Sequence, residues 1–388
     1  MNLKKRAGVL AALFFAVFAT AKGSDLIPDL DVPYEPTHPR VVEKMLSVAG
    51  VSEGDIVYDL GCGDGRIVVA AVKDFGAAGG VGIDLDPRRI REANERALGF
   101  GVQDRVEFIE GDIMDADISD ATVIAIYLLN SVNLMLRPKL FMELKPGTRI
   151  VSHAFHMSEW KEERRIYHER ARNRSIYYWV IPAHLGGVWI WETETGDGTS
   201  INSMDIEQRF QQVSGTLYSG ESVRFEITDA SLKGLKFSFS AEIGIGEKPV
   251  KVRYEGTVNG NSITGTQTRS YKNKEKIYPW KASRKAEELY GRWNISIDGD
   301  KSLHGGVLNL SRKGNMINAS YRMKDSPDLR EIKHIYVWGN SVYFYLPLPE
   351  GGGDLIFSGN LSGNIGGGTI TDETDGPVKY FWTGARIK

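Results

Sequence analysis

A glycine-rich turn that joins an apolar stretch to a helix-forming one limits the possible folds more than any other feature. Residues 55–60 have the pattern of a short strand, which runs into the turn at 59–65 (DLGCGDG), and helical spacing follows at 66–75. Glycines between a strand and a helix let a ligand approach the backbone, and the helix N-terminus offers unpaired N–H groups to a carboxylate or phosphate. The turn therefore predicts a ligand site on an α/β unit.

The segments around this turn alternate between helical and strand patterns. Helical spacing follows Pro39, Pro87 and Ser131, and Pro138 is expected to bend or interrupt the last of these helices. Alternation of this kind favours a parallel sheet covered by helices on both faces, so we expect a doubly wound α/β domain with a mostly parallel, seven-stranded sheet. The further expected strands are 81–84, 106–109, 121–129 and 149–152, followed by an antiparallel hairpin of 164–170 and 175–181.

The spacing of the glycines departs from the dinucleotide fingerprint, which requires Gly-x-Gly-x-x-Gly. The glycines here are Gly61, Gly63 and Gly65, and Arg66 occupies the third glycine position of that fingerprint. Asp84 ends the next expected strand, where an acidic side chain can hydrogen-bond the hydroxyls of a ribose. The alternative is that these are ordinary turn glycines and solvated caps.

The Asp-x-Gly-x-Gly-x-Gly arrangement resembles motif I of the class I S-adenosylmethionine-dependent methyltransferases. The resemblance implies S-adenosyl-L-methionine as the cofactor, with Asp84 and Asp112 where that family has its ribose-binding and adenine-binding acids. No metal is required for methyl transfer, and none is expected. The cofactor-binding residues that the resemblance implies are Asp59, Gly61, Gly63, Gly65, Asp84 and Asp112.

A closer resemblance connects residues 30–183 with the methyltransferase family that includes the lysine methyltransferases of the adenine nucleotide translocase and of the c-ring protein of ATP synthase. It implies methylation of a lysine in a protein substrate. Because substrate choice drifts on one scaffold, a small-molecule acceptor stays open. The segments that carry the resemblance are 32–37 (VPYEPT), 59–68 (DLGCGDGRIV), 127–129 (YLL), 136–140 (LRPKL) and 144–147 (LKPG).

Methyl transfer is an in-line displacement, so the enzyme must align an uncharged nucleophile with the methyl carbon and exclude water. A lysine amine has a pKa of about 10.4 and must lose its proton first, which favours an apolar pocket with one or two acceptor groups. Tyr127 and Asn130 follow the strand at 121–129, at the edge where ligands bind, and Tyr34 is placed to fold over the cofactor as a lid. These three are the candidate catalytic residues. Alternatively, Tyr127 is a core aromatic and Asn130 is a helix N-cap.

The first 21 residues have the pattern of a targeting segment. Three basic residues precede an uncharged apolar run at 7–21, which ends in Ala19-Thr20-Ala21 and is shorter than a spanning helix. The pattern predicts a signal peptide or an N-terminal anchor, hence an exported (periplasmic) or membrane-anchored protein close to a membrane. Because the methyl donor is made in the cytosol, an exported binding protein for a nucleoside or another ligand, without catalysis, is the alternative.

The second half of the chain contains a tandem repeat of about a hundred residues. Gly187-Val188-Trp189 recurs as Gly291-Arg292-Trp293, and short β-rich runs in both copies are separated by Gly, Asn and Asp turns. The opening Gly-x-Trp and a closing arginine resemble lipocalin-like small barrels. We expect one barrel at 186–285 and another at 290–388, and such barrels either hold a ligand or are filled by their own side chains.

Composition excludes several classes of protein. Lys and Arg number 48 and Asp and Glu number 50 in the 388 residues, a net charge of -2, so the chain has no broad positive surface for nucleic acid. The single cysteine, Cys62, excludes an internal disulfide and a cysteine-rich zinc site.

Overall fold

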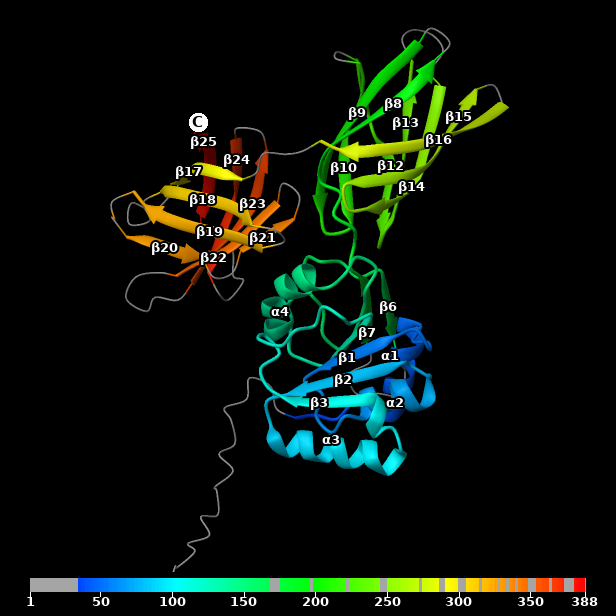
Figure 1. Cartoon of the computed structure of the whole chain (residues 1–388), viewed down its shortest axis with the longest axis vertical. Coiled ribbons are helices and arrows are strands. Elements are labelled where there is room, and N and C mark those ends of the chain that lie inside the picture. Colours follow the sequence, from blue (N-terminus) through cyan, green and yellow to red (C-terminus); the bar gives the residue numbers. More distant parts are fainter. Residues whose placement is uncertain are drawn as a thin grey trace, which may run out of the picture.

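The structure is a computed structural model that contains three β-sheets, one in an α/β region and two in antiparallel barrels (Figure 1). The expected signal peptide or anchor at 1–21 lies outside the described residues. In the part of the chain that is described, no helix is long and apolar enough to cross a membrane. The structure describes residues 34–167, 175–195, 198–220, 223–244, 250–271, 274–285, 290–298, 305–313, 316–324, 326, 328–332, 335–338, 341–347, 354–362, 365–372 and 380–387.

The first sheet has seven strands in the order β3-β2-β1-β4-β5-β7-β6. The first five run parallel, and β7 is antiparallel to both β5 and β6, as the hairpin pattern predicts. The expected α/β fold with a mostly parallel sheet is therefore confirmed. The strands are β1 (Ile56–Leu60), β2 (Gly79–Asp84), β3 (Val106–Glu110), β4 (Val123–Ile126), β5 (Arg149–His153), β6 (Arg164–Tyr167) and β7 (Ser175–Val180).

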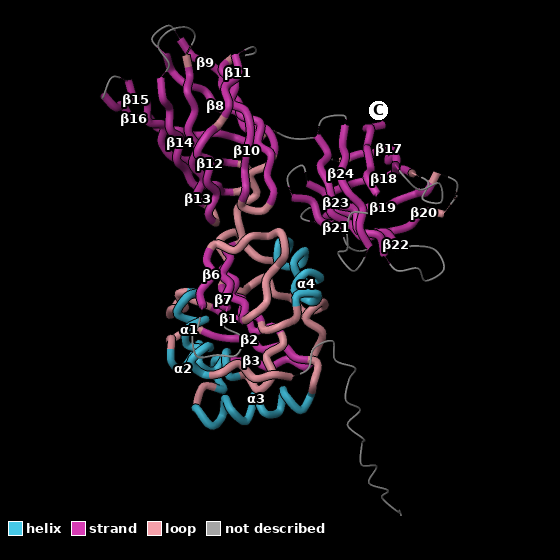
Figure 2. Tube along the Cα trace, turned by 180° about the vertical axis from the view of Figure 1, so that it is seen from behind, coloured by secondary structure: helices cyan, strands magenta, loops and turns pink. Residues whose placement is uncertain are grey.

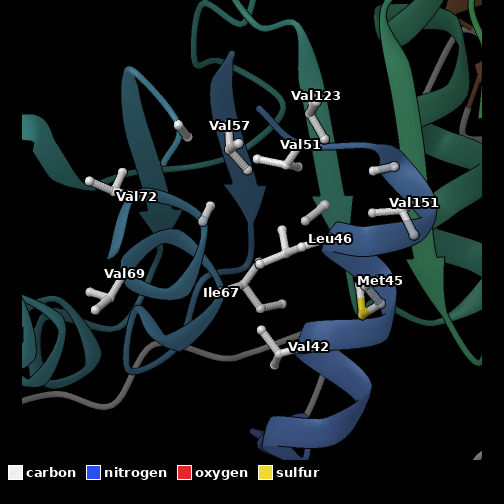
Figure 3. Close-up of a cluster of buried hydrophobic side chains, with 14 of the residues drawn as sticks. Val42, Met45, Leu46, Val51, Val57, Ile67, Val69, Val72, Val123 and Val151 are labelled. Carbon is white, nitrogen blue, oxygen red and sulfur yellow. The ribbon is translucent and has the colours of Figure 1, made fainter. Parts of the chain in front are cut away.

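Helices cover both faces of this sheet, because its central strand is apolar on both sides. Val123 and Ala125 of β4 pack into the cluster under α1 and α2, whereas Ile124 and Ile126 pack into the cluster under α4. Figure 3 shows the first cluster, in which Leu46 of α1 and Ile67 of α2 lie below Val57 and Val123 of the sheet. The helices are α1 (Pro39–Ala49), α2 (Arg66–Asp74), α3 (Pro87–Phe100) and α4 (Asn130–Glu143).

The central strand is shorter than the predicted 121–129. Its neighbour β1 ends at Leu60, which pairs with Ile126, and the glycine turn follows immediately, so β1 offers no ladder partner for Tyr127. The chain then enters α4, which contains Pro138 without being interrupted.

The repeats form two nine-stranded antiparallel sheets with the same strand order in each copy. In the first, β12 contacts β10 and β13 contacts β11, which brings the edges of the sheet together into a nearly closed barrel; the second has equivalent contacts. The first barrel contains β8 (Gly187–Thr195), β9 (Gly198–Arg209), β10 (Gln212–Ser219), β11 (Val223–Glu226), β12 (Thr228–Lys233), β13 (Lys236–Ile243), β14 (Val250–Asn259), β15 (Ser262–Tyr271) and β16 (Lys274–Arg284). The second contains β17 (Gly291–Asp298), β18 (Gly306–Lys313), β19 (Met316–Met323), β20 (Leu329–Ile332), β21 (Ile335–Trp338), β22 (Ser341–Pro347), β23 (Asp354–Ser362), β24 (Ile365–Asp372) and β25 (Tyr380–Ile387).

The same glycine pair recurs in both barrels for the same steric reason. Gly256 pairs with Gly265 in the first barrel, and Gly359 pairs with Gly368 in the second. A Cβ on Gly265 or on Gly368 would lie 1.9 Å from a backbone oxygen of the neighbouring strand, which no side chain tolerates. The glycines recur in the sequence because the same close approach of two strands recurs in each barrel.

A closing arginine covers the tryptophan of the first strand in each barrel, as the lipocalin-like pattern implies. The guanidinium carbon of Arg284 lies 4.3 Å from the ring centre of Trp189, and that of Arg386 lies 5.8 Å from the ring centre of Trp293. Arg284 also donates to the carbonyl oxygen of His184 at 2.6 Å. Buried aromatic rings occupy the interior of the first barrel, namely Trp191, Phe237, Phe239, Tyr254 and Trp280.

Candidate active site

The glycine turn between β1 and α2 has a backbone that only glycine adopts easily. Gly61, Gly63 and Gly65 have φ values of 80°, 52° and 71°, all in the left-handed region. A Cβ on Gly65 would lie 2.6 Å from the ring of Phe108 and 2.8 Å from the Cβ of Ala93. The turn is therefore pressed against β3 and α3, with no room for a side chain at Gly65.

Asp84, at the end of β2, fixes this turn from the side. Its Oδ2 accepts a hydrogen bond from Gly63 N at 2.8 Å, and its Oδ1 accepts one from Asp86 N at 2.9 Å. Burial raises the pKa of the Asp84 carboxyl, and these two backbone donors offset part of that effect. Asp84 thus holds the turn while it lines the cavity described below.

Asp112 reaches the same edge from the end of β3. Gly111 N donates to the carbonyl oxygen of Asp84 at 3.0 Å, which holds the two strand ends next to each other. The Oδ1 of Asp112 accepts from Met114 N at 2.8 Å, and both side chains line the cavity.

Asp59 lies at the base of the site and is almost completely buried, with 2% of its surface exposed. Burial raises the pKa of its carboxyl well above the usual range, and the negative charges of Asp84 and Asp64 add to this. A cation bound in the cavity would lower that pKa again, because it favours the ionised carboxylate.

An arginine pair anchors the start of α2. The Oδ2 of Asp64 accepts from Arg66 Nη2 and from Arg96 Nη2, both at 2.5 Å. Although burial raises the pKa of Asp64, the hydrogen bonds and positive charges of these arginines hold it below the usual value. Arg66 also donates to the carbonyl oxygen of Thr37 at 2.9 Å, which attaches the segment before α1 to the glycine turn.

Tyr34, the expected lid, lies across the glycine turn. A Cβ on Gly63 would be 2.5 Å from its ring, and the guanidinium carbon of Arg89 lies 3.9 Å from the ring centre. The side chain lines the cavity and remains 40% exposed. It therefore rests on the turn while one side faces solvent.

Tyr127, the second candidate, lines the cavity directly after β4. Its ring centre is 4.0 Å from that of the buried His153 and 6.0 Å from that of Phe155. His153 Nδ1 lies 3.2 Å from Thr37 Oγ1, so the segment before α1 and the end of β5 meet behind this tyrosine.

Asn130, the third candidate, bonds to the loop after β5. Its Oδ1 accepts from His156 N at 3.0 Å, and its Nδ2 lies 3.3 Å from His156 Nε2. It is not among the cavity-lining residues. The N-cap alternative is wrong, because α4 begins at Asn130 with Leu129 as its N-cap residue.

Five of the six implied cofactor-binding residues line one cavity of about 810 Å³, together with Tyr34 and Tyr127. The sixth, Gly65, does not line it. Its wall also includes residues that the sequence patterns did not indicate. Arg66 and Arg89 belong to helices next to recognised motifs, so their helical positions were a usable signal. Three wall residues come from the second barrel, for which no sequence signal existed: Tyr343, Tyr345 and Ile356.

The first barrel is attached to the acceptor side of this cavity. Phe210, in the turn between β9 and β10, lies with its ring centre 5.5 Å from that of Phe141 of α4 and 6.0 Å from that of Trp160. The guanidinium carbon of Arg137, which lines the cavity, is 5.4 Å from the same ring. Gln208 secures the turn, because its Nε2 donates to the carbonyl oxygen of Phe210 at 2.7 Å.

Comparison with known proteins places the α/β region in a family. Residues 59–164 match the ANTKMT methyltransferase domain. A protein-lysine N-methyltransferase of Saccharolobus islandicus is 48% identical over 154 residues, which are 39% of this chain and 96% of that protein. The adenine nucleotide translocase lysine N-methyltransferase of Mus musculus is 35% identical over 132 residues, which are 34% of this chain and 57% of that protein.

Among solved structures, an RNA methyltransferase of Salinibacter ruber in complex with S-adenosyl-L-homocysteine is 48% identical. It has a TM-score of 0.37, over 39% of this chain and 96% of that protein. Both barrels lie outside the residues that match the family. Because this chain spans nearly the whole length of a relative with 48% identity, it belongs to the ANTKMT methyltransferase family of S-adenosylmethionine-dependent methyltransferases.

Proposed function

We propose that the protein transfers methyl groups from S-adenosylmethionine to lysine side chains of a protein substrate. The observation that carries the proposal is the 48% identity with the protein-lysine N-methyltransferase of Saccharolobus islandicus over 96% of that protein. The cavity supports it, because its donor part is formed by the glycine turn and acidic side chains, while apolar residues such as Leu128 and Val132 line the part next to Tyr127. The two sides match the needs of the donor and of an uncharged amine.

The polar side fits the donor. Gly61 and Gly63 of the glycine turn line the cavity with backbone alone, in the left-handed conformation that favours glycine. Asp84 and Asp112 line the cavity at neighbouring strand ends, where carboxylate oxygens would accept hydrogen bonds from the ribose and the adenine. The carboxyl of Asp59 would pair with the ammonium group of the methionine part and become ionised as it does so.

When bound, S-adenosylmethionine supplies a methyl group activated by a positively charged sulfur. A lysine nitrogen would accept this methyl group, and the sulfur would keep the electron pair of the broken carbon–sulfur bond. The acceptor amine must arrive without its proton, and the buried surroundings of Leu128 and Val132 disfavour the ammonium form. Tyr127 offers a hydroxyl that would accept a hydrogen bond from the amine and orient its lone pair, and Tyr34 would exclude water from above.

The test is transfer of a labelled methyl group by the purified protein in an extract of the source cells. We expect label in the protein fraction and methylated lysine after acid hydrolysis. Asp84→Ala is expected to abolish binding of the donor, and Asp104→Ala, an exposed change in the short helix before β3, serves as its control. Label confined to small molecules would overturn the lysine acceptor, whereas donor binding by Asp84→Ala at the level of the unchanged protein would contradict the assigned site.

We further propose that the protein is exported or held at a membrane, so that the barrels act near a membrane surface. The basic residues and apolar run before residue 22 support this. Cell fractionation followed by intact mass measurement tests it. A soluble cytosolic species that retains Met1 would overturn it.

A further inference from the structure

The cavity extends beyond the α/β region to the second barrel. Two adjacent strands of that barrel, β22 and β23, contribute Tyr343, Tyr345 and Ile356 to its wall. Side chains of α4 also line the cavity, among them Met135 and Met142. Figures 1 and 2, seen from opposite sides, both place this barrel on the side of the α/β region where α4 lies.

The three barrel residues point outward from the barrel. Along β22, Val342, Phe344 and Leu346 are at most 1% exposed and fill the barrel interior, so Tyr343 and Tyr345 lie on the opposite face. Tyr345 pairs directly with Ile356 of β23, which places both on that outer face.

The low exposure of Ile356 shows that this outer face is enclosed by the cavity and is not open to bulk solvent. A strand with one face inside a barrel alternates between buried and exposed positions, yet Ile356 is 6% exposed between the interior residues Leu355 and Phe357. Its side chain is therefore shielded on the outer side while it lines the cavity.

The barrel part of this wall is aromatic and aliphatic, and α4 adds apolar side chains beside the charged Arg137, Lys139 and Glu143. Met135 and Met142 of α4 are 45% and 51% exposed, and their flexible thioether chains adapt to differently shaped apolar groups. The rings of Tyr343 and Tyr345 stand edge to face, with centres 5.6 Å apart. Exposed apolar surfaces next to a pocket mark binding sites for apolar partners.

We propose that the outer face of β22 and β23, together with α4, binds an apolar stretch of the substrate chain next to the methylated lysine. This rests on the proposed lysine acceptor. The cavity itself argues for this occupant, because the wall is continuous with the space that contains Tyr127 and the glycine turn. A lysine that reaches Tyr127 from this side carries its flanking residues past Tyr343 and Ile356.

Two peptides test the proposal with the full-length protein in saturating S-adenosylhomocysteine. Each has one central lysine and the same charged, fluorescent tail, and the flanks are Leu, Ala and Val in one and Ser, Thr and Gly in the other. We expect the apolar peptide to bind about tenfold more tightly, as burial of a single aliphatic side chain predicts. The double change Tyr343→Ser and Ile356→Ser should remove most of this preference. With S-adenosylmethionine in place of S-adenosylhomocysteine, it should raise the KM for the apolar peptide and leave kcat nearly unchanged.

The matched control is Phe381→Ser, which removes a 61% exposed aromatic from β25 of the same barrel. It should keep the preference, and donor affinity should be equal in all three proteins, which also verifies folding. Equal affinity for the two peptides, or a preference that survives the double change, would overturn the proposal even if both peptides are methylated. A preference that the double change removes, without methylation of either peptide, would support the wall and overturn the lysine acceptor instead.

Discussion

The two sides of the cavity are built in different ways. Most of the donor side comes from residues 59–115, in which three strand ends and a glycine turn are joined by hydrogen bonds, and Tyr34 covers the turn. The acceptor side combines Tyr127 and α4 with the turn at Phe210 of one barrel and two strands of the other. The donor part of the cavity is thus formed mainly by residues close together in the sequence, whereas the acceptor part depends on the packing of three separate units.

The largest effect is expected on the donor side, from Gly65→Ala. The left-handed backbone and the 2.6 Å approach to the ring of Phe108 would force the turn away from Asp84. A displacement of about 1 Å can cost about 100-fold in rate, so we expect methyl transfer to fall by about that factor and donor binding to weaken in calorimetry. Gly76→Ala is the control, because Gly76 has φ 72° but nothing within 4 Å of its Cβ position. If both changes weaken donor binding equally, backbone strain and not the close approach is the cause.

On the acceptor side, Phe210→Ala should separate the two halves of the site. Loss of the contacts with Phe141 and Trp160 would loosen α4, with an expected cost of about 1–2 kcal/mol in stability. The KM for a lysine peptide should rise about tenfold while donor affinity stays within about twofold. Ile201→Ala, a 60% exposed position of the same barrel, should change neither quantity. A parallel loss of donor affinity would contradict the separation.

Asp59→Asn tests the electrostatics of the donor side. Because burial raises the folded-state pKa of this carboxyl, its ionisation opposes folding. The cost is absent below the unfolded-state pKa, grows as the pH rises toward the folded-state pKa and is fully present above it. The variant without donor should therefore have a higher Tm than the unchanged protein at pH 8, and the difference should shrink toward pH 4. The same change should weaken donor binding. A Tm difference that does not vary with pH would show that the folded-state pKa of Asp59 is not raised.

The smallest effect is expected on stability, when the closing arginine of either barrel is replaced. Arg284 stacks more closely on its tryptophan than Arg386 does, at 4.3 against 5.8 Å, and donates to two carbonyl groups. Arg284→Ala should lower stability by about 1–2 kcal/mol and Arg386→Ala by about half of that, measured by chemical unfolding. Equal losses would indicate that the stacking distance does not set the contribution.

The fold and the donor side were largely predictable because their signals are local. The backbone shape and the chemistry of the donor side follow from glycines at 61, 63 and 65 and from acids at two strand ends. In the second half, the recurring residues include the glycines that close strand packing requires. The central strand was predicted too long, because the apolar run does not reveal that β1 ends at Leu60.

The acceptor side could not be predicted, because its residues meet only after three units pack together. Asn130 was assigned from its position after a strand, but its side chain bonds to His156, 26 residues away. Nothing in the sequence around Phe210 or Tyr343 distinguishes it from other barrel aromatics. Their significance comes from neighbours far away in the chain.

The recurring glycine pair has a consequence for how the two barrels can change. Since backbone oxygens 1.9 Å from the Cβ positions of Gly265 and Gly368 forbid any side chain there, each copy retains its interior while its outer face is free to vary. The duplication has thus given one catalytic domain two barrels with the same interior and different outer faces. The first barrel packs against α4, and the second contributes outer-face residues to the cavity wall. Changes on the outer face of the second barrel would therefore alter substrate choice without changing the residues that bind the donor.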